Sequence, residues 1–223
     1  AGGAINAWTG TEFANYHFHC RSTEIKRILP AFGDMMRLPL LDPDTLNKEI
    51  NAIEAEFQFK IKDDLRRLYQ IHKETANPLH PFSKFSVGNA DIFRSLSECE
   101  LHAALQQYHA QYYVGANMCL AIFTSENVDD VLELVSQSFG ALKAGEEANT
   151  EWPALYTPEQ LAVEINIVPL QTARRMIVTF ALPGLHQDFR TKPLNYLSHL
   201  IGDEGEGSLL AYLKNKNWVT NLI

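Results

Sequence analysis

The chain has 223 residues, of which 46% are hydrophobic and 21% are charged, and its formal net charge is −8. This composition is that of a soluble globular protein with enough apolar material for a core, and it excludes a disordered chain. The acidic balance and the scattered basic residues argue against nucleic acid or an anionic membrane surface as a partner. No apolar run approaches the roughly 18 residues that span a bilayer, so we expect no membrane span. The three cysteines are far apart, which indicates neither a disulfide framework nor a cysteine zinc site.

The first part of the chain predicts a hairpin followed by helices. Gly10-Thr11-Glu12 separates two segments rich in strand formers, which is typical of a hairpin or of two adjacent strands. Asp42 before Pro43 is a helix start, and Ser97-x-x-Glu100 is a capping box. The predicted elements are strands at 4–9, 13–20 and 117–124 and helices at 24–37, 43–72, 98–112 and 128–143.

A polar, helix-breaking stretch at 144–153 is the best candidate for a linker. Beyond it we expect strands at 162–169 and 175–182 and helices at 193–201 and 208–216. Strands and helices mix without a regular βαβ alternation, so the predicted class is α+β, an antiparallel sheet packed with helices. We divide the chain into two domains, residues 1–153 and 154–223.

Two glutamates of the predicted helix at 43–72 share one face. Residues seven apart return to within roughly 20° on a helix, so Glu49 and Glu56 stand two turns apart on the same side. Apolar residues flank that face on both sides, which predicts that the two carboxylates lie in an apolar furrow. Glu54 points away and is interpreted as an ordinary solvent-facing residue. The same spacing also fits two glutamates that simply meet a Lys or Arg from a neighbouring element.

His17 and His19 are the only close pair among the eight histidines. Two residues apart on a strand, they would face the same side and could both reach a metal ion. The same alternation is also typical of the solvent face of a half-buried sheet.

The segment Gly202-Asp203-Glu204-Gly205-Glu206-Gly207 is rich in glycine and acidic residues. Its carboxylates would repel an anion, so such a loop would sooner hold a cation, for example the terminal ammonium of a peptide. The alternative is a flexible turn that leads into a helix capped by Ser208.

The order of the motifs resembles the insulysin/pitrilysin family of inverted-motif zinc metallopeptidases, over essentially the whole chain. The segments that carry this resemblance are Asn6-Ala7-Trp8-Thr9, Asn15-Tyr16-His17-Phe18, Glu49-x6-Glu56, the stretch 77–85, and 201–210. In that family a His-x-x-Glu-His helix supplies two zinc ligands and the general base. The resemblance implies that Glu56 is the third zinc ligand and that Glu49 is the acidic residue that supports the ligand shell.

The resemblance also implies a mode of substrate binding. Asn6, Ala7, Trp8 and Thr9 would form an edge strand on which a peptide adds as an extra strand, and Trp8 would shape a pocket beside it, its alternative being a core aromatic. Gly202, Asp203, Gly205 and Gly207 would anchor the N-terminus of the peptide. Residues 1–153 would be the catalytic-type domain and residues 154–223 the beginning of a second, related domain.

The His-x-x-Glu-His motif is absent from the chain, so we interpret the sequence as a fragment that begins just after it. The expected function is that of a zinc metalloendopeptidase that hydrolyses peptides or small proteins in a closed chamber, with the fragment inactive by itself. Its expected cofactor is Zn²⁺ in the parent protein, and its expected partners are peptides and a missing C-terminal half or partner subunit. Two alternatives are a non-catalytic subunit or scaffold of the same fold, and a different hydrolase that uses His17 and His19.

Overall fold

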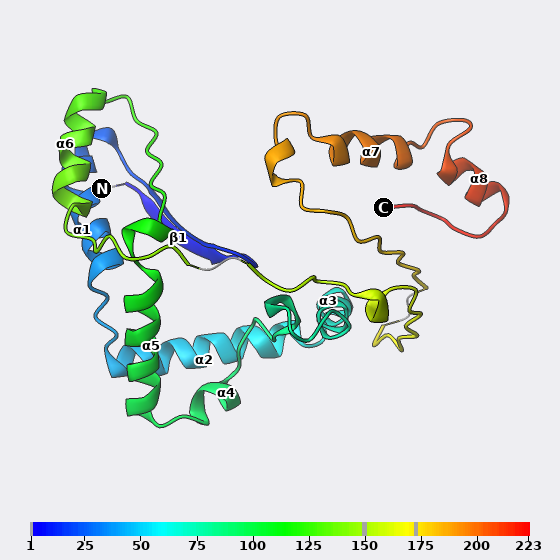
Figure 1. Cartoon of the computed structure of the whole chain (residues 1–223), viewed down its shortest axis with the longest axis horizontal. Helices are drawn as coiled ribbons and strands as arrows, with labels where there is room; N and C mark the ends of the chain where they lie inside the picture. The colour runs from blue at the N-terminus through cyan, green and yellow to red at the C-terminus, as the bar shows by residue number, and fades with distance from the viewer. Residues whose placement is uncertain (1, 149–150, 172–173) are drawn as a thin grey trace. The chain divides into compact units, whose positions relative to one another are not determined.

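The computed structural model describes residues 2–148, 151–171 and 174–223. The chain forms two compact units, Ala1–Arg174 and Arg175–Ile223, and each is considered by itself. Helices make up most of the regular structure, and the described residues contain one small antiparallel sheet (Figure 1). The predicted α+β class is therefore confirmed.

The elements of the first unit are two strands and six helices among its described residues. They are β1 (Ala4–Thr9), β2 (Ala14–His19), α1 (Ile25–Arg37), α2 (Pro43–Lys60), α3 (Asp64–Glu74), α4 (Ala90–Arg94), α5 (Glu98–Tyr112) and α6 (Val128–Phe139). The second unit contains α7 (Pro193–Ile201) and α8 (Leu209–Asn215). Short 3₁₀ turns lie between several of these elements.

The predicted hairpin is confirmed. Ala4 lies opposite His19 and Thr9 opposite Ala14 in an antiparallel ladder, and the Gly10 N–H donates to the carbonyl oxygen of Phe13 at 2.8 Å to close the turn. Phe18 packs on Phe32 of α1 with ring centroids 4.9 Å apart. Because successive side chains of a strand point to opposite faces, the even-numbered residues of β2 face the helices.

Helices α1 and α6 pack side by side next to the hairpin (Figure 1). The buried residues of α1 include Leu29, which is almost fully buried, and Phe32, which meets Phe139 of α6 edge to face. A Cβ atom at Gly33 would lie only 2.5 Å from the carbonyl oxygen of Ser138, so a glycine is needed where the two helices approach. The helix continues through Pro30 as a single element.

The predicted caps are confirmed. The Asp42 carboxylate accepts a hydrogen bond from the Thr45 N–H at 3.0 Å with Pro43 in the first turn, and Ser97 and Glu100 form a capping box at the start of α5. In the second unit Ser208 caps α8 through the Ala211 N–H at 3.1 Å.

The prediction of one helix over 43–72 is wrong. The helix ends after Lys60, and a second helix begins where the Asp63 carboxylate accepts from the Leu65 N–H at 2.8 Å. An aspartate that caps its own downstream N–H groups competes with continuation of the preceding helix, which explains the break.

The predicted strands at 117–124, 162–169 and 175–182 are also wrong, because these segments belong to no strand. Their β-branched and apolar composition favours an extended chain, but a strand exists only where a neighbouring strand completes its hydrogen bonds. Across residues 2–148, 151–171 and 174–223, β1 and β2 are the strands that find such a partner.

Candidate active site

The two glutamates singled out by the sequence lie on α2. Both Glu49 and Glu56 are exposed, and their seven-residue spacing places them on one face of the helix. Glu56 forms an ion pair with the ammonium group of Lys60 one turn later; the two side chains are 56% and 25% exposed. Glu56 therefore does meet a lysine, but one of its own helix rather than one from a neighbouring element.

The apolar residues beside these carboxylates divide into a packed side and an open side. One side consists of four buried or half-buried residues, Leu46, Ile50, Ile53 and Phe57, and it ends at Ile61, which is 44% exposed. Exposed residues form the other: Ala52, Ala55 and Phe59, with Phe59 85% exposed. The prediction that the carboxylates lie within an apolar furrow is therefore wrong for this chain, where they lie at the border between packed helix surface and solvent.

Glu54, interpreted from the sequence as solvent-facing, makes a tertiary contact with the start of α4. Its carboxylate accepts from the Ala90 N–H and from the Gln58 side-chain amide, each at 2.7 Å. These hydrogen bonds, the backbone one foremost, lower the pKa of Glu54. Because Ala90 opens α4, Glu54 satisfies a free N–H at the start of that helix and ties α4 to α2. The Asn89 cap was the sequence signal for a helix start there.

The predicted substrate-binding strand is open to solvent. Residues Asn6 to Thr9 of β1 are all exposed, and β1 pairs with β2 alone among the strands of the described chain. The Ala7 N–H donates to the side-chain oxygen of Asn6 at 2.9 Å. Trp8 is 48% exposed and meets Phe13 edge to face at 5.2 Å, so it is not a core aromatic here.

The loop from Gly202 to Gly207 lies in the second unit and is exposed throughout. Its conformation is set by local bonds, since the Gly205 N–H donates to Asp203 Oδ2 at 3.2 Å and the Ser208 N–H donates to the Gly205 carbonyl oxygen at 3.2 Å. Gly207 has a φ of 82°, a value that other residues rarely adopt.

The segment after the predicted linker is bound to α3, which the sequence did not indicate. Asn77, just beyond α3, donates from its side-chain amide to the Ala154 carbonyl oxygen at 2.7 Å and from its backbone N–H to that of Leu155 at 2.9 Å. One residue further on, the Tyr156 hydroxyl and His72 Nε2 are hydrogen-bonded at 2.7 Å.

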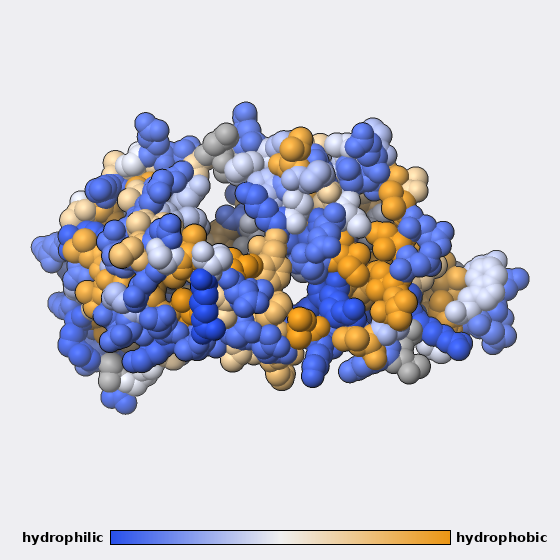
Figure 2. Space-filling model, turned by 90° about the horizontal axis from the view of Figure 1, so that it is seen from below, coloured by the Kyte–Doolittle hydropathy of each residue, from blue (hydrophilic) through white to orange (hydrophobic). Residues whose placement is uncertain are grey.

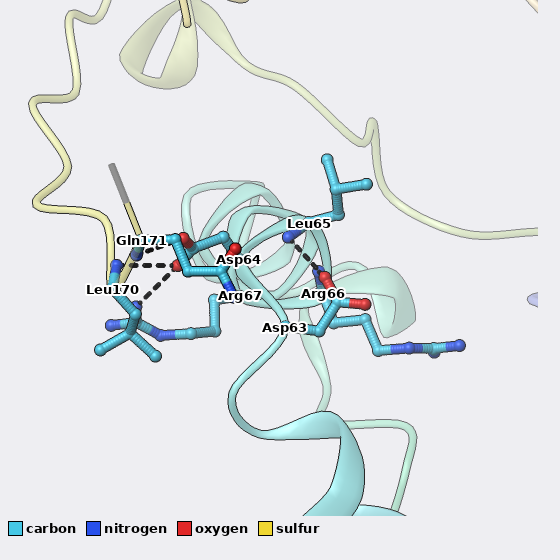
Figure 3. A network of polar contacts seen from close by, with 7 residues as sticks. All are labelled: Asp63, Asp64, Leu65, Arg66, Arg67, Leu170 and Gln171. Atoms are coloured by element: carbon cyan, nitrogen blue, oxygen red, sulfur yellow. Dashed lines mark hydrogen bonds and ion pairs between the residues drawn. The ribbon is translucent and has the colours of Figure 1, made fainter. Parts of the chain in front are cut away.

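Asp64 binds a later part of the same segment (Figure 3). Its carboxylate accepts from the backbone N–H groups of Leu170 at 3.0 Å and Gln171 at 3.1 Å, and it pairs with Arg67 at 3.1 Å. The two backbone hydrogen bonds are the main cause of the lowered pKa of Asp64. These contacts explain why the first compact unit extends to Arg174. The domain division after residue 153 stays a prediction, because the contacts within a compact unit do not show whether two domains are structurally related.

A zinc site needs more donors than the described residues bring together. Within residues 2–148, 151–171 and 174–223, no group of three or more His, Cys, Asp or Glu side chains is placed to hold a metal ion. A catalytic zinc site takes three protein ligands, so Glu56 by itself does not fit the requirement. Over the same described residues, no helix is long and apolar enough to cross a membrane.

Comparison with known proteins identifies the class. Residues 1–79 match the model of the family described as Insulinase (Peptidase family M16), and residues 101–223 match that of the Peptidase M16 inactive domain. Among similar proteins, the Insulin-degrading enzyme of Drosophila melanogaster is 31% identical over 227 residues, covering 100% of this chain and 23% of the relative. The Insulin-degrading enzyme of Homo sapiens is 34% identical over 225 residues, covering 99% and 22%.

Solved structures agree with this match. The crystal structure of pitrilysin has a TM-score of 0.80 at 25% identity, covering 99% of this chain and 24% of that one. A protease from Helicobacter pylori has a TM-score of 0.54 at 21% identity, covering 70% and 36%, which is a likeness of fold alone. Fold and matches together place the chain in a family of peptidases. The chain belongs to the insulysin/pitrilysin family, peptidase family M16, and it spans about a quarter of the length of the relatives it matches.

Proposed function

We propose that this chain acts as part of a zinc metalloendopeptidase that hydrolyses peptides or small proteins inside a closed chamber. Membership of peptidase family M16 supports the proposal. The observation that supports particular residues is that Glu49 and Glu56 lie on one exposed face of α2, beside exposed apolar residues that include Phe59. Relatives named for insulin degradation support peptides as the substrate class.

In this proposal Glu56 supplies one zinc ligand and Glu49 supports the ligand shell. A bound zinc ion would supply Lewis-acid chemistry and an activated water. The two further ligands and the general base come from residues outside this chain, so residues 1–223 alone are expected to cleave nothing. Because the Glu56 carboxylate forms an ion pair with the Lys60 ammonium in this structure, that pair has to break before Glu56 binds a metal ion.

The substrate contacts follow from the open strand and the acidic loop. A peptide would add to the free edge of β1 along Asn6, Ala7, Trp8 and Thr9, where its carbonyl oxygen would compete with the Asn6 side chain for the Ala7 N–H. Gly202, Asp203, Gly205 and Gly207 would hold the terminal ammonium of the peptide, with the Asp203 carboxylate as counter-charge. Residues 1–153 would then be the catalytic-type domain and residues 154–223 the start of a second, related domain.

The test compares the full-length parent with its Glu56→Gln variant, measuring zinc content and cleavage of a short peptide. Glu133→Gln, an exposed glutamate of α6, is the matched control. We expect Glu56→Gln to lose both zinc and activity, because each ligand of a three-ligand site is needed. A variant that keeps its zinc would show that Glu56 is not a ligand.

The second candidate is a non-catalytic subunit or scaffold of the same fold. It is favoured by the match of residues 101–223 to a domain described as inactive. This candidate predicts that the full-length parent itself binds no zinc and cuts no peptide. In that case the Glu56–Lys60 ion pair is the whole role of that carboxylate.

A further inference from the structure

Two histidines of β2 lie on the face of the hairpin that points away from the helices. Phe18 packs on Phe32, and the Tyr16 hydroxyl is hydrogen-bonded to that of Tyr113, so the even-numbered side chains of β2 face α1 and the end of α5. His17 and His19 therefore share the opposite face, with Cα atoms about 6.7 Å apart. Both are exposed, so their imidazoles are open to ions from solvent.

A hydrogen bond already orients one of the two imidazoles. His17 Nδ1 lies 3.0 Å from the side-chain oxygen of Asn15, which is on the same face of the strand. An amide oxygen can only accept, so Nδ1 carries the proton and Nε2 presents its lone pair. Histidines that bind metals usually donate their other ring N–H to such an acceptor, which fixes the tautomer and the ring orientation.

The residues opposite the pair place no charge beside it. In the ladder Asn6 lies opposite His17 and Ala4 lies opposite His19. The side-chain oxygen of Asn6 accepts from the Ala7 N–H, and the side chain of Ala4 is only a methyl group. A cation that approaches the two imidazoles thus meets no charged group from Asn6 or Ala4. The nearest basic residue along the chain is Arg21, two residues beyond His19, and its guanidinium lies beside Gly2.

We propose that His17 and His19 bind one divalent transition-metal ion, with Asn15 as a positioning residue. The ion binds through Nε2 of His17 and a ring nitrogen of His19, and water completes its coordination. Imidazole ligands select Cu²⁺, Ni²⁺ and Zn²⁺ over Mg²⁺ and Ca²⁺, and for a given site Cu²⁺ binds most tightly of these. This site is separate from Glu56 on α2 and does not rest on the proposed peptidase function.

The test is a titration of the 223-residue chain, freed of metal, with Cu²⁺ against a chromophoric chelator. The variants are His17→Asn, His19→Asn and Asn15→Ala, and the matched control is His199→Asn, an exposed histidine of α7. We expect one Cu²⁺ per wild-type chain and a loss of affinity of more than about tenfold in each of the two β2 histidine variants. Asn15→Ala should weaken binding about tenfold, because orienting partners contribute about that much.

Spectroscopy separates this site from scattered binding to surface histidines. The electron paramagnetic resonance spectrum of bound Cu²⁺ should show nitrogen ligands in the wild-type chain and in His199→Asn, and a changed signal in His17→Asn and His19→Asn. The proposal is overturned if either β2 variant binds Cu²⁺ as tightly as the wild type, or if His199→Asn weakens binding equally. Unchanged affinity in Asn15→Ala would overturn the positioning role of that residue.

Discussion

Asn77 is the residue whose loss should most directly release the segment that follows the linker. It is 6% exposed. Its side-chain amide donates to the Ala154 carbonyl oxygen at 2.7 Å, and its side-chain oxygen accepts from the Leu79 N–H at 3.0 Å. In Asn77→Ala both side-chain hydrogen bonds disappear, while the backbone bond to Leu155 can remain. The substitution therefore removes one of the two hydrogen bonds from Asn77 to the segment and leaves the backbone bond in place.

The expected cost follows from two hydrogen bonds in a part-buried place. Each contributes about 0.5–1.5 kcal/mol net, and a partner left unsatisfied adds to that, so Asn77→Ala should lower the free energy of unfolding by about 2 kcal/mol. Urea unfolding of the 223-residue chain measures this change. Limited proteolysis should also cut sooner between residues 154 and 171, because that segment loses a fixed point.

The matched control is Asn166→Ala, an exposed asparagine whose side chain contacts Glu164. Exposed substitutions of this kind usually change stability by less than about 0.5 kcal/mol. If Asn77→Ala proves no more destabilising than Asn166→Ala, and the proteolysis pattern is unchanged, then the contacts of Asn77 do not hold the segment in place.

Three further predictions concern stability and its dependence on pH. The backbone bonds from Leu170 and Gln171 lower the pKa of Asp64 below 3.8, so its stabilisation is present above that value and is lost as the pH falls through the lowered pKa. In Asp64→Ala the free energy of unfolding should therefore depend less steeply on pH in the acid range, and protease should cut sooner near residue 170. Burial lowers the pKa of Lys73 below 10.5, so stability should rise with pH between the lowered value and 10.5, and Lys73→Met should abolish that rise in urea unfolding. Ser97→Ala should cost about 1 kcal/mol of unfolding free energy in the same assay, because it removes a helix cap.

The parts of the fold that the sequence predicted well are those specified by neighbouring residues. The Gly10-Thr11-Glu12 turn, Pro43 after its Asp42 cap, and the Ser97 capping box each contain the groups that complete their own hydrogen bonds. Local chemistry of this kind acts whatever the rest of the chain does, so these elements begin where the sequence predicts them.

The errors arise where a distant partner decides the outcome. A helical wheel predicts that Glu54 faces solvent, yet its carboxylate accepts a hydrogen bond from the N–H of Ala90, 36 residues later. The strand predicted at 117–124 has the composition of a strand, but composition does not supply a neighbouring strand. Asp63 was a local signal that could have been read, since a capping residue inside a long helical pattern predicts a restart.

The two candidate metal sites differ in what this chain contributes to each. At α2 the chain offers the single carboxylate of Glu56, and Lys60 already neutralises it. At β2 it offers two imidazoles on one face, one of them oriented by Asn15. The affinity of a site for a metal depends on how many ligands it brings together and on how they are oriented. Metal binding by residues 1–223 should therefore require the β2 histidines and should not change in Glu56→Gln. Zinc-dependent cleavage by the parent should show the opposite dependence, which allows each assignment to fail without the other.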